Sequence, residues 1–421
     1  MALAIGFGWL AGSVELYIAR LAGVSTLTFV LIDLFVWTTV VSTGYLSGRH
    51  QSRVRHRSAL GAGTWVAGAM VLAVVGVLTI VAIRHQPDGS WDAWAIWNLR
   101  ATFLAEPAPD WRNGFSEALA WSHPDYPLLI PASIARVWTL TGARLSLVPV
   151  AVAGSFTAAT ALLLVGALAH SASSMKVVAA LGLLMVPTFV LNGLSQCADV
   201  PVAFFALATA TLLDCGTSDD ERPWTLAGVA AAAAAWTKNE GMVLAILLIL
   251  AFLYDRWRRR GLGHAWGVAR AVILGAAPIV WIVASFKLLL APPNDLVSGL
   301  WLPGVIATRL RDTVRMAFVG SYMLERGFFW GGWPVMGPMP ILLGIGTLNR
   351  ADTVARGAAG RALALHVLVL AAVYTFTPHS VAWHLATSWE RLLAQLWPTA
   401  VWWAFVSRPM GKHGSSTPQI G

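Results

Sequence analysis

Isolated ionisable residues lie at the borders of long apolar runs in this chain. Two of them are carboxylates, Asp92 and Asp199, and two are cations, Lys238 and Arg391. A carboxylate can take the proton from an attacking hydroxyl, and cations at a lipid boundary can bind the phosphate of a lipid carrier. A lipid phosphate is already a good leaving group, so one base plus charge stabilisation would suffice for transfer chemistry. We therefore take these four residues as the main candidates for a site.

Each of these residues also has a purely structural interpretation. Asp92 or Asp199 could cap a helix, because Asp is common at helix N-termini. Lys238 lies in the run Thr237-Lys238-Asn239-Glu240-Gly241, which could be a tight helical hairpin. Arg391 could simply extend its head group to the membrane interface. The sequence alone leaves both interpretations open.

Four further residues are weaker candidates. Asp88 competes with Asp92 for the role of base, and Glu240 follows Lys238 by two residues. His123 and Asp125 lie in the Pro-rich stretch Ser122-His123-Pro124-Asp125-Tyr126-Pro127, which favours a rigid turn. Two potential ligands are a weak metal signal, so no metal or other cofactor is predicted, although a divalent metal remains possible.

Composition determines what must position these residues. The chain of 421 residues is 57% hydrophobic and 12% charged, with a mean hydropathy of +0.66, which is typical of an integral membrane protein. Its apolar runs are near-continuous, which predicts an all-α bundle and not a barrel. The net charge of +9 comes from short basic segments between apolar runs, a pattern that indicates orientation and not nucleic-acid binding.

The apolar runs predict about twelve transmembrane helices in a single domain over residues 1–408. These runs cover residues 3–22, 25–47, 60–83, 145–169, 176–194, 199–214, 225–237, 241–254, 266–290, 333–348, 362–378 and 391–407.

Basic residues orient the predicted spans. The loops expected on the cytoplasmic side carry Arg49, Arg53, Arg55 and Arg57, then Arg256 and Arg258 to Arg260, then Arg350, Arg356 and Arg361, with Arg408 and Lys412 in the tail. This predicts a multi-pass protein of the plasma (cell inner) membrane with its site on the extracytoplasmic side. Residues 409–421 are expected to form a disordered cytoplasmic tail.

Two long segments are predicted on the outer side. The first, 84–144, is expected to contain interfacial helices, one of them starting near Ser90. The second, 291–332, contains Arg309, Arg311, Arg315 and the pair Gly331-Gly332. It is either an acceptor or lid loop or a plain interfacial helix. Cys197 and Cys215 flank one predicted span and are not expected to pair.

These motifs together resemble those of the GT-C glycosyltransferases. The similarity rests on Trp91-Asp92-Ala93-Trp94, Ala198-Asp199-Val200-Pro201, Thr237-Lys238-Asn239-Glu240-Gly241 and Glu390-Arg391, in that order. The nearest branch is the bacterial set similar to protein mannosyltransferases and aminoarabinose transferases. The chain departs from that pattern in having three predicted spans before the first outer loop, and in lacking the Asp-Glu pair of several relatives.

The resemblance implies a GT-C type bundle that transfers a sugar from a polyprenyl-phosphate donor to an envelope glycan, lipid or protein. By motif position, Asp92 would be the general base and Asp199 the second acidic residue. Lys238 would bind the donor phosphate, assisted by Arg391. His123 and Asp125 are weaker correspondences. Attack with a single displacement would invert the anomeric configuration.

Two other classes of protein fit the same composition. A secondary transporter or lipid-linked sugar flippase would also be a polytopic bundle, but should contain interrupted helices with polar groups near mid-membrane. A non-catalytic scaffold of envelope synthesis would use the outer loop for docking, and would not need Asp92.

Overall fold

Every regular element that the structure describes is a helix. The structure, a computed structural model, describes residues 1–51, 61–168, 171–294, 296, 304–332, 337–349 and 354–406. Its helices are α1 (Ala2–Leu21), α2 (Thr26–Gln51), α3 (Ala62–His85), η1 (Ala93–Asn98), α4 (Leu99–Ala105), η2 (Asp110–Phe115), η3 (Glu117–Ser122), α5 (Leu129–Thr141), α6 (Leu147–Ala167), α7 (Ser173–Leu184), α8 (Pro187–Leu194), α9 (Asp199–Cys215), α10 (Arg222–Thr237), α11 (Asn239–Arg260), α12 (Leu262–Leu289), α14 (Val305–Arg311), α15 (Thr313–Phe328), α16 (Pro338–Leu348), α17 (Val354–Phe376) and α18 (Val381–Phe405). The predicted all-α class is confirmed for these residues.

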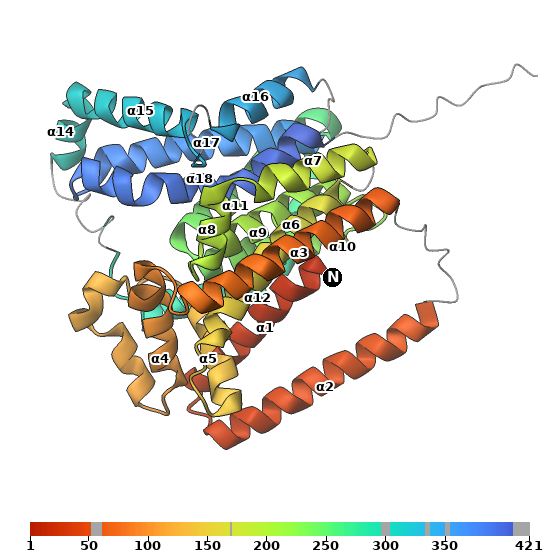
Figure 1. The fold of residues 1–421 in the computed structure, drawn as a ribbon, viewed down its shortest axis with the longest axis vertical. Coiled ribbons are helices and arrows are strands. Elements are labelled where there is room, and N and C mark those ends of the chain that lie inside the picture. Colours follow the sequence, from red (N-terminus) through yellow and green to blue (C-terminus); the bar gives the residue numbers. More distant parts are fainter. Residues whose placement is uncertain are drawn as a thin grey trace, which may run out of the picture.

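Helix α9 is the central element of the bundle (Figure 1). Every residue from Asp199 to Leu213 is buried, and α9 packs against α6, α10, α11 and α18. A helix that is apolar on all sides has to be enclosed by other helices, and α9 is enclosed in this way. Its first residue, Asp199, is therefore buried where α9 begins.

Several helices have the length and composition of membrane spans. Within the described ranges these are α1, α2 (26–44), α3, α6, α12 and α17 (356–376), with a seventh if α7 and α8 count as one bent span. Helices α9 and α10 have only 17 and 16 residues. The chain thus has the helices of a membrane protein, while the predicted number of about twelve spans is not confirmed.

Two predicted spans differ from the helices at those positions. The run 176–194 breaks between α7 and α8, which are bent by 68°, and Pro187 opens the second helix. The last predicted span begins at residue 391, whereas α18 begins ten residues earlier at Val381. Glu390 and Arg391 therefore lie within a helix and not at its start. Arg53, Arg55, Arg57, Arg350, Arg408 and the predicted tail at 409–421 lie outside the described residues.

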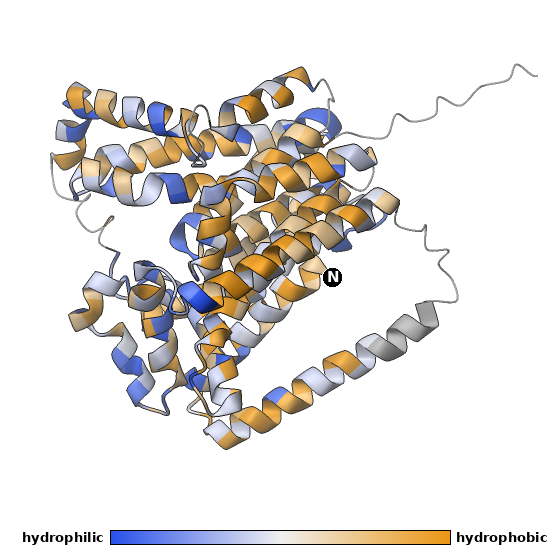
Figure 2. Ribbon diagram, in the orientation of Figure 1, coloured by the Kyte–Doolittle hydropathy of each residue, from blue (hydrophilic) through white to orange (hydrophobic). Residues whose placement is uncertain are grey.

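The predicted outer loop 84–144 is itself helical. It contains η1, α4, η2, η3 and α5, and α5 packs against α1 with most of its residues buried. Hydrophilic residues are frequent around α4, in contrast to the predominantly hydrophobic α1, α3 and α6 (Figure 2). A helix does begin at Trp91, close to the predicted Ser90. The interfacial position of these helices is not confirmed.

The segment 291–332 also forms helices where it is described. Helix α15 lies against α17 and α18, and Asp312 caps its N-terminus by accepting a hydrogen bond from the backbone N–H of Arg315. The Arg315 guanidinium donates to the backbone carbonyls of Thr375 and Thr377 at the end of α17. Arg315 thus links α15 to the end of α17 and supplies hydrogen bonds to carbonyl groups that have no partner within that helix.

Glycine allows α10 and α12 to approach closely. A Cβ on Gly275 would lie 1.9 Å from the carbonyl oxygen of Thr225, and one on Gly228 would lie 2.0 Å from that of Val272. Small residues at a helix crossing allow such backbone contact in membrane bundles. This packing fixes α10, which ends one residue before Lys238.

We expect Gly275→Ala to lower the melting temperature of the purified protein, because the added methyl would force the helices apart at a cost of about 1–3 kcal/mol. Gly267→Ala on the same helix is the matched control, since a Cβ there meets nothing within 4 Å. It should leave the melting temperature unchanged or raise it, because Ala favours helix more than Gly. Equal effects of both changes would contradict the packing argument.

Candidate functional site

The four main sequence candidates meet at one end of α9. Oδ1 of Asp199 accepts hydrogen bonds from Lys238 Nζ at 3.1 Å and from Gln395 Nε2 at 2.7 Å. Its Oδ2 accepts from Nε and Nη2 of Arg391 at 3.0 and 2.8 Å. Nη1 of Arg391 donates to Oδ2 of Asp92. One arginine thus joins the two carboxylates that the sequence singled out.

The exposure of these side chains increases from Asp199 outward. The Asp199 side chain is 0% exposed and that of Lys238 7%, whereas Arg391 and Asp92 are each 25% exposed. The inner pair is a buried ion pair, while the Arg391–Asp92 pair is partly exposed. Arginine carries five N–H donors, so Arg391 keeps donors for a further acceptor after these three bonds.

The capping interpretation of Asp199 is wrong. Ala198 occupies the N-cap position of α9, and the carboxylate of Asp199 makes no capping bond. Asp199 lies instead in the first helical turn, where the helix dipole favours negative charge. Its two oxygens accept hydrogen bonds from side chains of the α10–α11 break and of α18.

Asp92 is at the N-cap position of η1, yet its side chain makes no capping hydrogen bond. The capping interpretation therefore does not explain this residue either. η1 is a short π-helix, and π-bulges are frequent at functional sites because they redirect a side chain within a helix. The carboxylate of Asp92 is directed to Arg391.

Lys238 occupies a tight break between α10 and α11, as the hairpin interpretation requires. Gly241 lies so close to α10 that a Cβ there would be 2.4 Å from the carbonyl oxygen of Ala234. The ammonium group is 3.1 Å from Asp199 and 3.4 Å from Glu240. Burial alone would lower the pKa of Lys238, but these two carboxylates outweigh burial and hold the pKa above its ordinary value. Lys238 is therefore charged and enclosed by anions.

Asp125 belongs to a second polar cluster beside the first. Its Oδ2 accepts from Nδ2 of Asn239 at 2.8 Å and from Nδ2 of Asn294 at 2.7 Å. Lys287 Nζ donates to the backbone carbonyl of Asp125 at 2.5 Å and to Oδ1 of Asn239 at 2.9 Å. Since Asn239 follows Lys238, this cluster links the segment 84–144 to the site.

The ring of Tyr126 lies near Lys238 of the first cluster, and Tyr126 follows Asp125 of the second cluster in the sequence. It stacks on Trp97 and on His123, with centroid distances of 5.5 and 5.1 Å, and Lys238 Nζ lies 5.7 Å from its centroid. Burial raises the pKa of Tyr126 well above its ordinary value, so this side chain stays neutral. His123 adopts a left-handed backbone conformation with φ of 49°. These features fit the interpretation of 122–127 as a rigid turn.

Asp88 and Glu240 differ in their relation to the site. Asp88 is exposed in the turn after α3, and that turn is held by a hydrogen bond of 2.7 Å from Gln196 Nε2 to the carbonyl of Pro87. Glu240 is beside Lys238, and its Oε2 is buried without a hydrogen-bond partner. Geometry therefore favours Asp92 over Asp88 as a site residue, and keeps Glu240 at its edge.

Among the described residues, no group of three or more His, Cys, Asp or Glu side chains is arranged to hold a metal ion. The guanidinium of Arg391 lies between the carboxylates of Asp92 and Asp199. The two cysteines are free, and they lie near opposite ends of α9.

No site role was predicted from the sequence for Gln395, Lys287 or Asn294. Gln395 follows Arg391 by four residues and so lies on the same helix face, which was a usable signal. Lys287 is an isolated ammonium in an apolar run, and such residues are usually paired or functional. Asn294 had no comparable signal, because its contact with Asp125 joins residues 169 positions apart.

Comparison of the chain with protein-family models, with curated proteins and with solved structures gives no match. The GT-C resemblance thus stays a prediction from short motifs.

We expect Asp199→Ala to destabilise the protein by about 3–5 kcal/mol, because it removes the fully buried carboxylate that pairs with both Lys238 and Arg391. Asp92→Ala should cost much less, since its ion pair is partly exposed. Asp88→Ala is the matched control and should leave stability unchanged. Thermal unfolding of the three purified variants tests this order, and a melting temperature of Asp199→Ala equal to that of Asp88→Ala would contradict it.

Proposed function

We propose that the protein is a membrane glycosyltransferase that moves a sugar from a polyprenyl-phosphate donor to an extracytoplasmic acceptor. The observation that carries this proposal is the pairing of Asp92 with Arg391 beside two hollows of opposite polarity. One is polar and has Arg391 in its wall, and the other is apolar. A lipid phosphate needs both environments, together with a base for the attacking hydroxyl.

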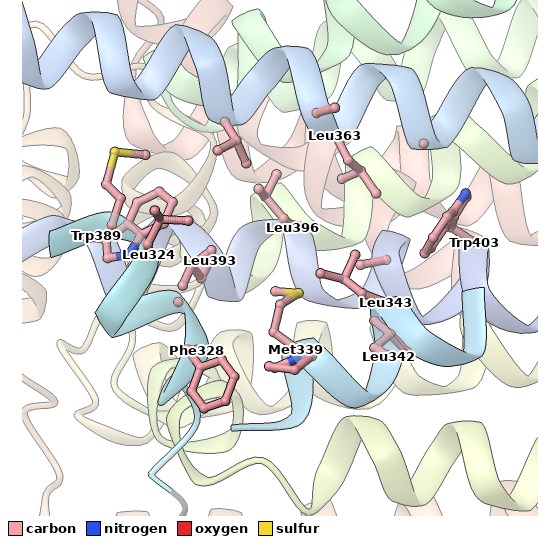
Figure 3. Close-up of a pocket in the computed structure, with 17 residues that line it drawn as sticks. Leu324, Phe328, Met339, Leu342, Leu343, Leu363, Trp389, Leu393, Leu396 and Trp403 are labelled. Atoms are coloured by element: carbon pink, nitrogen blue, oxygen red, sulfur yellow. The ribbon is translucent and has the colours of Figure 1, made fainter. Parts of the chain in front are cut away.

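The apolar hollow is a groove of about 500 Å³ formed by α15, α16, α17 and α18 (Figure 3). Leu324 and Phe328 of α15 face Leu393 and Leu396 of α18 across it, and Trp389 lies at one end. We propose that the hydrocarbon chain of the donor occupies this groove. Trp389 is two residues from Arg391, so a chain in the groove brings its head group toward the site.

The polar hollow, of about 360 Å³, contains Arg391 together with side chains of α8 and α15. In the proposed reaction the acceptor oxygen attacks the anomeric carbon as the bond from that carbon to the phosphate oxygen breaks. The electron pair leaves with the phosphate, and Asp92 takes the acceptor's proton. Remaining N–H donors of Arg391 stabilise the charge on the departing phosphate.

Lys238 is proposed to act by positioning. Sequence motifs assign it to the donor phosphate, but its ammonium is enclosed by Asp199 and Glu240 and is only 7% exposed. Its charge holds the carboxylate of Asp199 in place, and Asp199 in turn fixes Arg391. The phosphate contact then falls to Arg391 and to the wall of the polar hollow.

We expect Asp92→Asn to lower transfer of labelled sugar from a polyprenyl-phosphate donor pool about 10²–10⁴-fold in membranes, because removing a general base has effects of this size. Asp88→Asn, at matched expression, should retain activity. The product should have inverted anomeric configuration. Unchanged turnover of Asp92→Asn would remove the base assignment, and a retained configuration would contradict the single displacement.

The proposed site requires residues 84–144 on the extracytoplasmic side of the plasma membrane. Cys215 is exposed near the end of α9 that is remote from the site, whereas Cys197 is buried. In intact cells an impermeant maleimide should label the double variant Asp110→Cys, Cys215→Ser. The same reagent should label Cys215 of the unmodified chain only after the cells are permeabilised. The reverse pattern would place the site on the cytoplasmic side.

One observation favours a second candidate, a transporter or flippase for lipid-linked sugars. The bent pair α7–α8 is an interrupted helix of the kind found in transporters, and α8 contributes Thr188 and Asn192 to the polar hollow. Movement of a labelled polyprenyl-phosphate sugar across vesicles containing the purified protein, without transfer to any acceptor, would support this candidate over the glycosyltransferase.

A further inference from the structure

The polar hollow beside Arg391 contains a second arginine that the sequence motifs did not single out. Arg326 of α15 lines it together with Tyr322, and the opposite wall is α18 with Thr387, Glu390 and Arg391. The guanidinium of Arg326 lies over the Tyr322 ring, 5.7 Å from the centroid. The hollow thus has two guanidinium groups and one carboxylate in its wall.

Arg326 is the more available of the two cations. Its side chain is 52% exposed, and its nearest anion, Glu390, is 3.9 Å away, longer than a hydrogen bond. Arg391 is committed to Asp199 and Asp92 through three of its nitrogen atoms. An anion that enters the hollow therefore finds only the remaining donors of Arg391, but finds the guanidinium fork of Arg326 largely unoccupied.

Helix α15 also separates the polar hollow from the apolar groove. Tyr322 and Arg326, four residues apart, line the hollow, whereas the neighbouring Met323 and Gly327 line the groove. Helix α18 repeats this pattern, with Arg391 in the hollow and Leu393 in the groove. The two helices therefore present a cationic pocket and an apolar channel to one amphiphilic molecule.

We propose that Arg326 is a phosphate-binding residue, which takes the anionic head group of a lipid whose chain lies in the groove between α15 and α18. This inference rests on the proposed function, since it specifies where the donor's phosphate binds. It assigns that contact to Arg326 with Arg391, and leaves Lys238 buried behind Asp199. The bidentate fork of arginine suits phosphate oxygens, and Tyr322 holds the guanidinium plane.

Equilibrium binding of radiolabelled undecaprenyl phosphate and undecaprenol to the purified full-length chain in detergent tests the proposal. The unmodified protein should bind the phosphate form more tightly. Arg326→Ala should weaken binding of undecaprenyl phosphate about tenfold, the effect of losing one charge-assisted contact, and leave undecaprenol binding unchanged. Arg326→Lys should recover part of the loss. Arg311→Ala, an exposed arginine on the neighbouring α14, is the matched control and should bind both lipids normally.

Each contrary result has a distinct meaning. Full preference for the phosphate form in Arg326→Ala overturns the role of Arg326 and leaves the proposed function standing. Equal loss of both lipids in this variant also overturns it, because the change then damages the groove. Displacement of the lipid by millimolar inorganic phosphate would show that the hollow binds a free anion. It would overturn the assignment of the hollow to a lipid head group. Absence of any preference in the unmodified protein overturns both this inference and the donor class of the proposed function.

Discussion

The carboxylate of Asp199 is a buried charge at the start of the central helix, and the arrangement of the site follows from the need to compensate it. An unpaired ion in such a place costs several kcal/mol, so the fold must deliver cations and hydrogen-bond donors to both oxygens. Lys238 and Gln395 reach one oxygen and Arg391 reaches the other. Because these partners come from the α10–α11 break and from α18, satisfying one carboxylate fixes three segments that are distant in the sequence.

Arg391 connects the buried carboxylate of Asp199 to the partly exposed carboxylate of Asp92. Two hydrogen bonds to Asp199 fix the orientation of its guanidinium plane. The same group also donates a hydrogen bond to Asp92. A carboxylate held in this way is preorganised, because its direction is set before any other group approaches it. The cluster around Asp125 adds a second support, because Asn239 and Lys287 link the segment 84–144 to α11 and α12.

Helices α15 and α18 line both the polar hollow and the apolar groove. Each presents polar residues to the hollow and apolar residues to the groove within one or two positions, since successive residues of a helix point in directions about 100° apart. Arg315 holds α15 against the end of α17 through backbone carbonyls. A helix fixed in this way keeps the polar hollow and the apolar groove next to each other.

The sequence by itself determined the helical class, the presence of apolar helices that could span a membrane, and the four residues that meet at the start of α9. Hydropathy is a local property, and an ionisable residue at the edge of an apolar run is costly enough to stand out in a single sequence. The sequence could not decide between a helix cap and a role in a functional site for Asp92 and Asp199, because both uses begin with the same residue type at the same position. It also misplaced the start of α18 by ten residues, since polar residues within that helix resemble a loop when their partners are unknown.

Tertiary structure decided which of these residues touch. Asp199 and Arg391 are 192 positions apart, and Arg391 and Asp92 are 299 apart. No local pattern encodes such contacts, because they depend on how α9 and α18 cross in the bundle. The enclosure of Lys238, the support from Gln395 and the exposure of Arg326 beside an apolar groove follow from the same packing. Residue types and their spacing therefore suggested the chemistry, and the packing of the bundle determined which groups remain available to a ligand.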